Sequence, residues 1–271
     1  MEKDEARLWK EIINSNVEQE LLEVLSRSDR GEKEKASSLL MRVIDSVLYK
    51  MEGIIDMKIP EITYINNIAV RSPIIYTKSR NLIHVDTEKF VECLVIYKIC
   101  AGLTPIETLY YSILHELGHY QLDKMGINPP ANMKSPRFQA LYSKFEDYAI
   151  SRFLRGENYR VIEEKLLRFN ALRSCKAVSI PMLKLIWDQG LGYLVRSILN
   201  RNVENISTIA LAVALGYIDE KTIETKYGVP SIVISRIRLI AENLARIDRD
   251  NISKIPEISC ETWVKYVSAP S

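Results

Sequence analysis

Residues 110–120 read Tyr110-Tyr111-Ser112-Ile113-Leu114-His115-Glu116-Leu117-Gly118-His119-Tyr120, and this stretch contains the pattern His-Glu-x-x-His. Residues four apart share one face of an α-helix, so His115 and His119 can present two imidazoles to one metal ion. Glu116 lies about 100° further round the helix. Its carboxylate is therefore beside the ion rather than on it, where it can take a proton from a water molecule on the metal.

The residues on both sides of this motif predict a helix. Thr104-Pro105-Ile106-Glu107 has an N-cap residue, a proline at the first helical position and a glutamate near N3. Gly126 offers a stop, with Pro129 and Pro130 just beyond it. Apolar residues recur between these ends at helical spacing: Ile106, Leu109, Tyr110, Ile113, Leu114 and Leu117. The pattern leaves one alternative open, a buried helix whose histidines are hydrogen-bonded core residues.

Zinc in a hydrolytic site takes three protein ligands and keeps one position for water. The sequence offers Glu146 as the third ligand. Its helical face otherwise carries Tyr142, Ala149, Ile150 and Phe153. A carboxylate on such an apolar face is costly unless it is paired or bound to a cation. Asp147 lies about 100° away, nearer the polar side. The alternative for Glu146 is a salt-bridged glutamate at the edge of the core.

His115-Glu116-Leu117-Gly118-His119, followed by a helix with Glu146-x-x-Ala149, resembles the gluzincin metallopeptidases and most closely their intracellular ImmA/IrrE-like branch. The resemblance covers residues 60–155. It implies peptide-bond hydrolysis with one zinc ion per chain, three ligands (His115, His119 and Glu146) and Glu116 as general base. A metzincin is not expected, because Met125 stands where a third histidine would follow.

Length and composition are those of an ordinary globular protein. The chain has 271 residues, enough for one large domain or two small ones, and a net charge of only +2, which gives no argument for nucleic acid. The charged N-terminus and the lack of a long apolar run predict a cytoplasmic protein without a membrane segment. Four scattered cysteines form no Cys-x-x-Cys pair, so free thiols are expected.

We expect an α+β fold that is predominantly helical, with a zincin-like core built from a small antiparallel sheet and two ligand-bearing helices. The predicted regions are an N-terminal helical hairpin (1–58), the core (59–156) and a C-terminal helical region (157–271). Outside the two ligand-bearing helices, helices are expected at 4–28, 32–57, 87–101, 158–172, 180–200, 205–215, 219–227 and 231–247, with a short element near Trp263. Strands are expected at 62–65, 68–70, 74–77 and 82–86.

The predicted sheet lies directly before the metal helices. An exposed sheet edge can pair with an extended backbone, so a peptide or protein substrate is expected. Alternation places His84 opposite Ile83 and Val85, where it either stabilises an oxyanion or faces solvent. Tyr142 is a further candidate for stabilising the oxyanion, and the others are Tyr148, Tyr120 and Tyr76.

Residues 219–247 resemble a helix-turn-helix, with Gly228 at the turn. Lys226, Arg236 and Arg238 could contact the phosphates of DNA, and an ordinary αα-hairpin is the alternative. A second function class is therefore a DNA-binding regulator with a zincin-like domain, whose zinc site is sensory, structural or cuts a partner. A helical scaffold without metal is the third.

Overall fold

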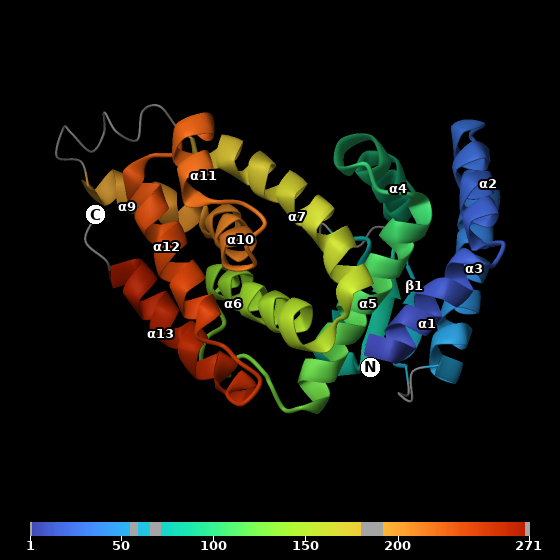
Figure 1. Ribbon diagram of the computed structural model, residues 1–271, viewed down its shortest axis with the longest axis horizontal. Helices are drawn as coiled ribbons and strands as arrows, with labels where there is room; N and C mark the ends of the chain where they lie inside the picture. The colour runs from blue at the N-terminus through green and yellow to red at the C-terminus, as the bar shows by residue number, and fades with distance from the viewer. Residues whose placement is uncertain (1, 55–58, 66–71, 180–191, 269–271) are drawn as a thin grey trace. The chain divides into compact units, whose positions relative to one another are not determined.

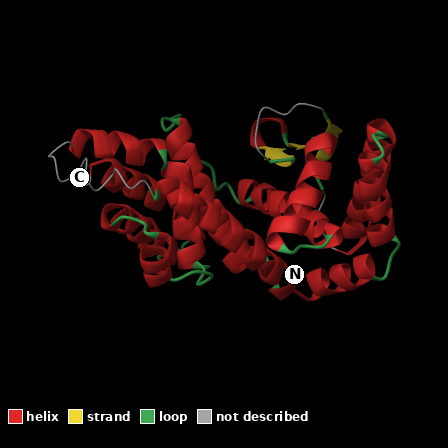
Figure 2. Cartoon of the chain, turned by 90° about the horizontal axis from the view of Figure 1, so that it is seen from above, coloured by secondary structure: helices red, strands yellow, loops and turns green. Residues whose placement is uncertain are grey.

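The computed structural model describes residues 2–54, 59–65, 72–179 and 192–268. These residues are predominantly helical and include a small sheet (Figures 1 and 2), which has three strands. The chain divides into two compact units. The first unit comprises Met1–Lys124 and Leu154–Leu166, and the second comprises Met125–Phe153 and Leu167–Ser271. The predicted division into three regions stays a prediction.

The first unit holds the sheet and the helix with the His-Glu-x-x-His motif. Its elements are α1 (Glu2–Ile13), α2 (Val17–Asp29), α3 (Lys33–Ile54), β1 (Glu61–Tyr64), β2 (Ile74–Thr77), a 3₁₀ turn (Lys78–Arg80), β3 (Leu82–Val85), α4 (Thr87–Ala101) and α5 (Pro105–Lys124). Helix α3 packs on α1, α2 and α4, whereas α5 packs on α2, α4 and β2. The motif helix therefore contacts both the helices and the sheet of this unit.

The second unit is built from helices. Its elements are α6 (Pro136–Ala149), most of a π-helical turn (Ile150–Leu154), the C-terminal part of α7 (Glu157–Val178), α9 (Gly192–Arg201), α10 (Val203–Ala214), α11 (Glu220–Tyr227), α12 (Ser231–Ala245), a 3₁₀ turn (Ile252–Lys254) and α13 (Ile255–Ser268). Helix α6 packs on α10 and α13, and α12 packs on the same two helices. The first ten residues of α7 belong to the first unit, so this helix runs through both.

The start of α5 confirms the predicted N-terminal cap. The Thr104 amide donates to Glu107 Oε2 at 2.7 Å, and the Glu107 amide donates to Thr104 Oγ1 at 3.2 Å. This reciprocal pair satisfies two backbone donors near the helix start. The helix ends at Lys124, and Gly126 follows with a φ of 75°, a left-handed conformation that glycine adopts without a steric penalty.

The sheet differs from the expectation. Its order is β1-β3-β2, with β2 antiparallel to β3 but β1 parallel to β3, so the sheet is mixed and the antiparallel prediction was wrong. The prediction failed because β3 lies between β1 and β2, and sequence proximity does not show which strands are neighbours. The predicted strand at 68–70 lies outside the described residues.

Two helix predictions also need correction. The helix expected at 4–28 is two helices, α1 and α2, separated at Asn14–Asn16, where the Ser15 hydroxyl donates to the Ile12 carbonyl at 2.6 Å. A polar side chain that bonds its own backbone competes with helix continuation. Helix α7 extends past its predicted end at 172 to Val178, and most of the helix expected at 180–200 lies outside the described residues. None of the helices within the described ranges is both long and apolar enough to cross a bilayer.

Helix α1 contributes a buried carboxylate to the start of α7. Glu5 Oε2 accepts a hydrogen bond from the Gly156 amide at 3.0 Å, and its residue is only 5% exposed. Burial raises the pKa of Glu5 above its ordinary value of 4.5, although the charge of Arg155 acts in the opposite direction. The protonated form is therefore favoured more in the folded chain than in the unfolded one.

This raised pKa predicts a pH dependence of stability. The stabilisation from protonated Glu5 is fully present below its unfolded pKa and is lost as pH rises through the folded value. Wild type should therefore lose unfolding free energy relative to Glu5→Gln as pH rises above 4.5. Urea unfolding at a series of pH values measures this difference, with the exposed Glu11→Gln change in the same helix as a control. A difference that grows in favour of wild type would show that attraction to Arg155 outweighs burial.

Candidate metal centre

The two histidines of α5 point their ring nitrogens at each other. His115 Nε2 and His119 Nε2 lie 3.3 Å apart, and the ring planes meet at 85°. Two nitrogens that each lie about 2.0–2.1 Å from a tetrahedral zinc ion are separated by about 3.3 Å. The pair therefore has the spacing of two ligands of one zinc ion, which is also the spacing of a hydrogen bond between one protonated and one bare ring nitrogen.

The His115 ring is held from its other side by two tyrosines. Its Nδ1 lies 3.0 Å from the Tyr159 hydroxyl, which comes from the first turn of α7. Tyr111 stacks on the His115 ring with 5.5 Å between centroids, and it stacks on Tyr159 at 4.9 Å. Tyr111 is one helical turn before His115, so its position beside that ring was predictable from the sequence. The contact with Tyr159 was not, because 44 positions separate the two residues.

Glu116 is anchored to the sheet. Its Oε2 accepts a hydrogen bond from the Tyr76 amide of β2 at 2.7 Å, and the residue is buried. Tyr76 belongs to the strand at one edge of the sheet. The general-base candidate is therefore oriented by a fixed backbone donor and lies in the turn of α5 between the two histidines.

Helix α6 carries Glu146, which the sequence offered as the third ligand, and its neighbour Asp147. Glu146 and Asp147 are both buried, and Lys144 Nζ lies 2.7 Å from Asp147 Oδ2. The two histidines belong to the first unit, whereas Glu146 and Asp147 belong to the second, so the third ligand stays a prediction.

The residues considered for oxyanion stabilisation are in different environments. His84 on β3 is half-buried, opposite the buried Ile83 and Val85 as alternation predicted. Its partner in β2 is Ile75, whereas Tyr76 pairs with Ile83 on the other face of the sheet, so His84 is on the face opposite the Tyr76 side chain. Tyr142 is buried in α6, and burial raises its pKa, which keeps its hydroxyl protonated. These roles stay predictions.

The hydroxyl of Tyr76 is committed to a structural role. It lies 2.7 Å from Asp123 Oδ2 and 3.2 Å from Asn81 Oδ1, and its ring meets that of Tyr120 edge-on. A hydroxyl that donates to a carboxylate stabilises the position of β2 against α5. This arrangement makes Tyr76 a poor candidate for oxyanion stabilisation and a good one for anchoring the strand.

The C-terminal residues proposed to contact DNA do not form a basic surface. Arg236 is only 3% exposed, and its guanidinium hydrogen-bonds the Tyr266 carbonyl of α13 and lies over the Tyr266 ring, so its prediction as a phosphate contact was wrong. Arg238 is exposed but pairs with Glu220 at 2.7 Å. Lys226 is exposed and lies over the Tyr227 ring, 5.8 Å from its centroid. Sequence spacing did not show that α13 covers Arg236.

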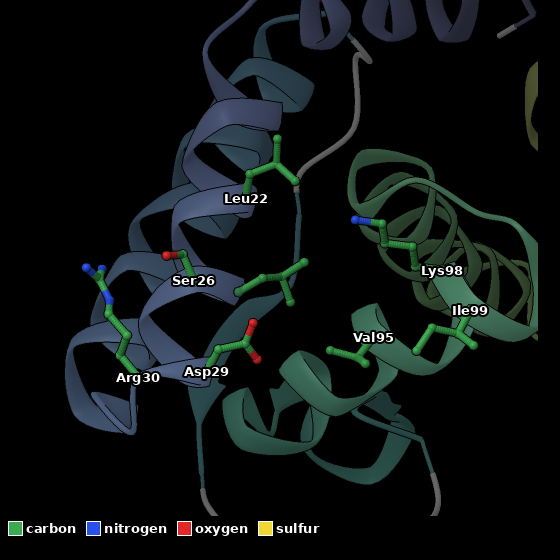
Figure 3. A pocket seen from close by; sticks show the side chains of 8 residues that line it. Leu22, Ser26, Asp29, Arg30, Val95, Lys98 and Ile99 are labelled. Atoms are coloured by element: carbon green, nitrogen blue, oxygen red, sulfur yellow. The ribbon is translucent and has the colours of Figure 1, made fainter.

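A surface pocket lies elsewhere in the first unit, between α2 and α4. It encloses about 720 Å³ and, as Figure 3 shows, Leu22 and Val95 extend into the gap from opposite helices. Its lining is Leu22, Leu25, Ser26, Asp29, Arg30, Val95, Lys98 and Ile99. This set includes no histidine or cysteine and none of the residues around the imidazole pair, so the pocket is separate from the candidate metal centre.

No protein-family model matches this sequence, and no significant match was found to a curated protein or to a solved structure. The resemblance to the gluzincins therefore rests on the motif residues alone. The geometry of the imidazole pair supports a metal centre independently of that resemblance.

The centre predicts a defined metal content. The purified protein should carry about one zinc ion per chain, and His115→Ala or His119→Ala should release it, because each removes one of three protein ligands. Elemental analysis after dialysis measures this. Glu146→Gln and Asp147→Asn form a matched pair that identifies the third ligand, since each replaces a carboxylate by its amide. Zinc retention by His115→Ala at the wild-type level would exclude this centre.

Proposed function

We propose that this protein is a zinc-dependent peptidase. In this proposal His115, His119 and a carboxylate of α6 hold the ion, and Glu116 is the general base. The observation that carries the proposal is the 3.3 Å separation of the two Nε2 atoms with a buried glutamate next to one of them in the helix. The third ligand proposed from the sequence is Glu146 of α6.

The residues present fit a hydrolytic zinc ion. Two imidazoles and one carboxylate are a ligand set of hydrolytic zinc sites, which keep one position for water. When bound, the ion would act as a Lewis acid that makes a water molecule nucleophilic near neutral pH. The chain supplies the proton transfers. Glu116 accepts the proton of the attacking water and delivers it to the leaving amine.

The fixed position of Glu116 suits this task. A general base must lie within hydrogen-bond reach of the proton that it takes, so its carboxylate has to keep one orientation during attack. The Tyr76 amide provides this restraint through its 2.7 Å hydrogen bond. Tyr76 is itself fixed through its hydroxyl to Asp123, near the end of α5. These two hydrogen bonds fix the position of β2 against α5 and the orientation of the Glu116 carboxylate.

The same contact supports a polypeptide substrate. Strand β2 is at an edge of the sheet and packs directly on the helix that carries Glu116. An extended peptide can add to such an edge through backbone hydrogen bonds, which bring its carbonyl groups alongside the base. Because the Tyr76 amide already donates to Glu116, pairing with substrate would use other backbone groups of β2.

The experiment that tests this function is the Glu116→Gln change. The variant keeps the size and the hydrogen-bond acceptor of the side chain but removes the base, so hydrolysis should fall by about 10²–10⁴-fold while zinc content stays at the wild-type level. Cleavage of a peptide library, followed by mass spectrometry, provides the substrate and the rate.

A matched control is Glu88→Gln, the same chemical change at an exposed position of α4. It should leave both cleavage and zinc content unchanged. Equal cleavage by wild type and Glu116→Gln would contradict the mechanism. Retention of zinc by both proteins without cleavage of any peptide would contradict the peptidase function and leave a structural or sensory metal site.

A further inference from the structure

The segment from Arg155 to Tyr159, which includes the start of α7, hydrogen-bonds two successive residues of the motif helix. Arg155, two residues before this helix begins, donates from Nε to the Leu114 carbonyl at 2.9 Å and from Nη2 to the same oxygen at 2.5 Å. One turn later, the Tyr159 hydroxyl meets Nδ1 of His115 at 3.0 Å. The backbone before the ligand and the ring of the ligand itself are therefore both fixed by one short segment.

The geometry points to Tyr159 as the positioning residue that sets the tautomer of His115, with the proton on Nδ1 and the lone pair of Nε2 directed at the metal. This inference rests on the proposed function in treating His115 as a ligand. Neutral imidazole has one protonated and one bare nitrogen, and a hydrogen bond to one of them selects the form. A metal-binding histidine needs the bare nitrogen toward the ion, and its outer nitrogen usually donates to a protein acceptor.

The surroundings of Tyr159 make its hydroxyl a suitable acceptor. The side chain is fully buried, so solvent does not compete for the hydrogen bond. A phenol oxygen can accept a hydrogen bond from the protonated Nδ1 of His115.

Tyr111 helps to orient the His115 ring but does not select its tautomer. It stacks on both the His115 ring and the Tyr159 ring, with interplanar angles of 22° and 20°. Stacking limits rotation of the imidazole out of its plane but does not distinguish Nδ1 from Nε2. The Tyr159 hydroxyl meets Nδ1 of His115 and the His119 ring meets Nε2, so these two contacts address different ring nitrogens.

The test begins with metal-free protein, so that its result does not depend on zinc binding. Nitrogen-15 NMR of the histidine side chains, at a pH above the ordinary histidine pKa, reports which ring nitrogen carries the proton. The chain has three histidines, so removing each in turn assigns the signals. We expect His115 to be protonated at Nδ1 in wild type and to shift toward the Nε2-protonated form in Tyr159→Phe.

Zinc affinity gives the second readout. Loss of an outer hydrogen-bond partner of a metal-binding histidine typically weakens metal affinity by about 10–100-fold, so Tyr159→Phe should bind zinc more weakly by that factor. Tyr266→Phe is the matched control: it removes another buried hydroxyl, which donates to the Leu199 carbonyl at 2.8 Å in the second unit. The control should keep both the tautomer and the zinc affinity of wild type.

Two results would overturn the inference: a wild-type His115 protonated at Nε2, or a Tyr159→Phe protein that binds zinc as tightly as Tyr266→Phe. Failure of the proposed function has a different signature. A wild-type protein that binds no zinc, yet has His115 protonated at Nδ1 only while Tyr159 is present, would contradict the zinc enzyme and support the contact with Tyr159.

Discussion

The convergence of two imidazoles on one face of α5 is the constraint on which the rest of the site depends. Two basic nitrogens at 3.3 Å need a shared cation or a shared proton between them, because their lone pairs otherwise repel each other. The helix supplies the spacing, and neighbouring elements supply the orientation of each side chain. Tyr159 meets His115, and β2 meets Glu116.

These contacts explain why the helices before the sheet matter to the site. Glu5 in α1 accepts a hydrogen bond from Gly156 and attracts Arg155, whose guanidinium in turn bonds the Leu114 carbonyl. A chain of polar contacts thus runs from α1, through the segment that precedes α7, to the residue before His115. Buried polar groups must be paired to be tolerated, so this network also specifies one arrangement of the three elements.

The sequence was most informative where the determinants are local. The cap at Thr104 and Glu107 and the extents of β2 and α4 are all set by residues close together in the chain, and each was predicted correctly. Distant partners were not predictable in this way. The parallel pairing of β1 with β3, the burial of Arg236 beneath α13 and the Tyr159 contact each depend on segments brought together only by folding.

The most direct test of the account is X-ray absorption at the zinc edge of the purified protein. Two histidines, one carboxylate and a water molecule should give a nearest shell of nitrogen and oxygen only, at about 2.0–2.1 Å. The imidazole rings should add the outer-shell scattering that identifies two histidines. A nearest shell that contains sulfur at about 2.3 Å, or protein that takes up no zinc, would contradict a metal centre built on His115 and His119.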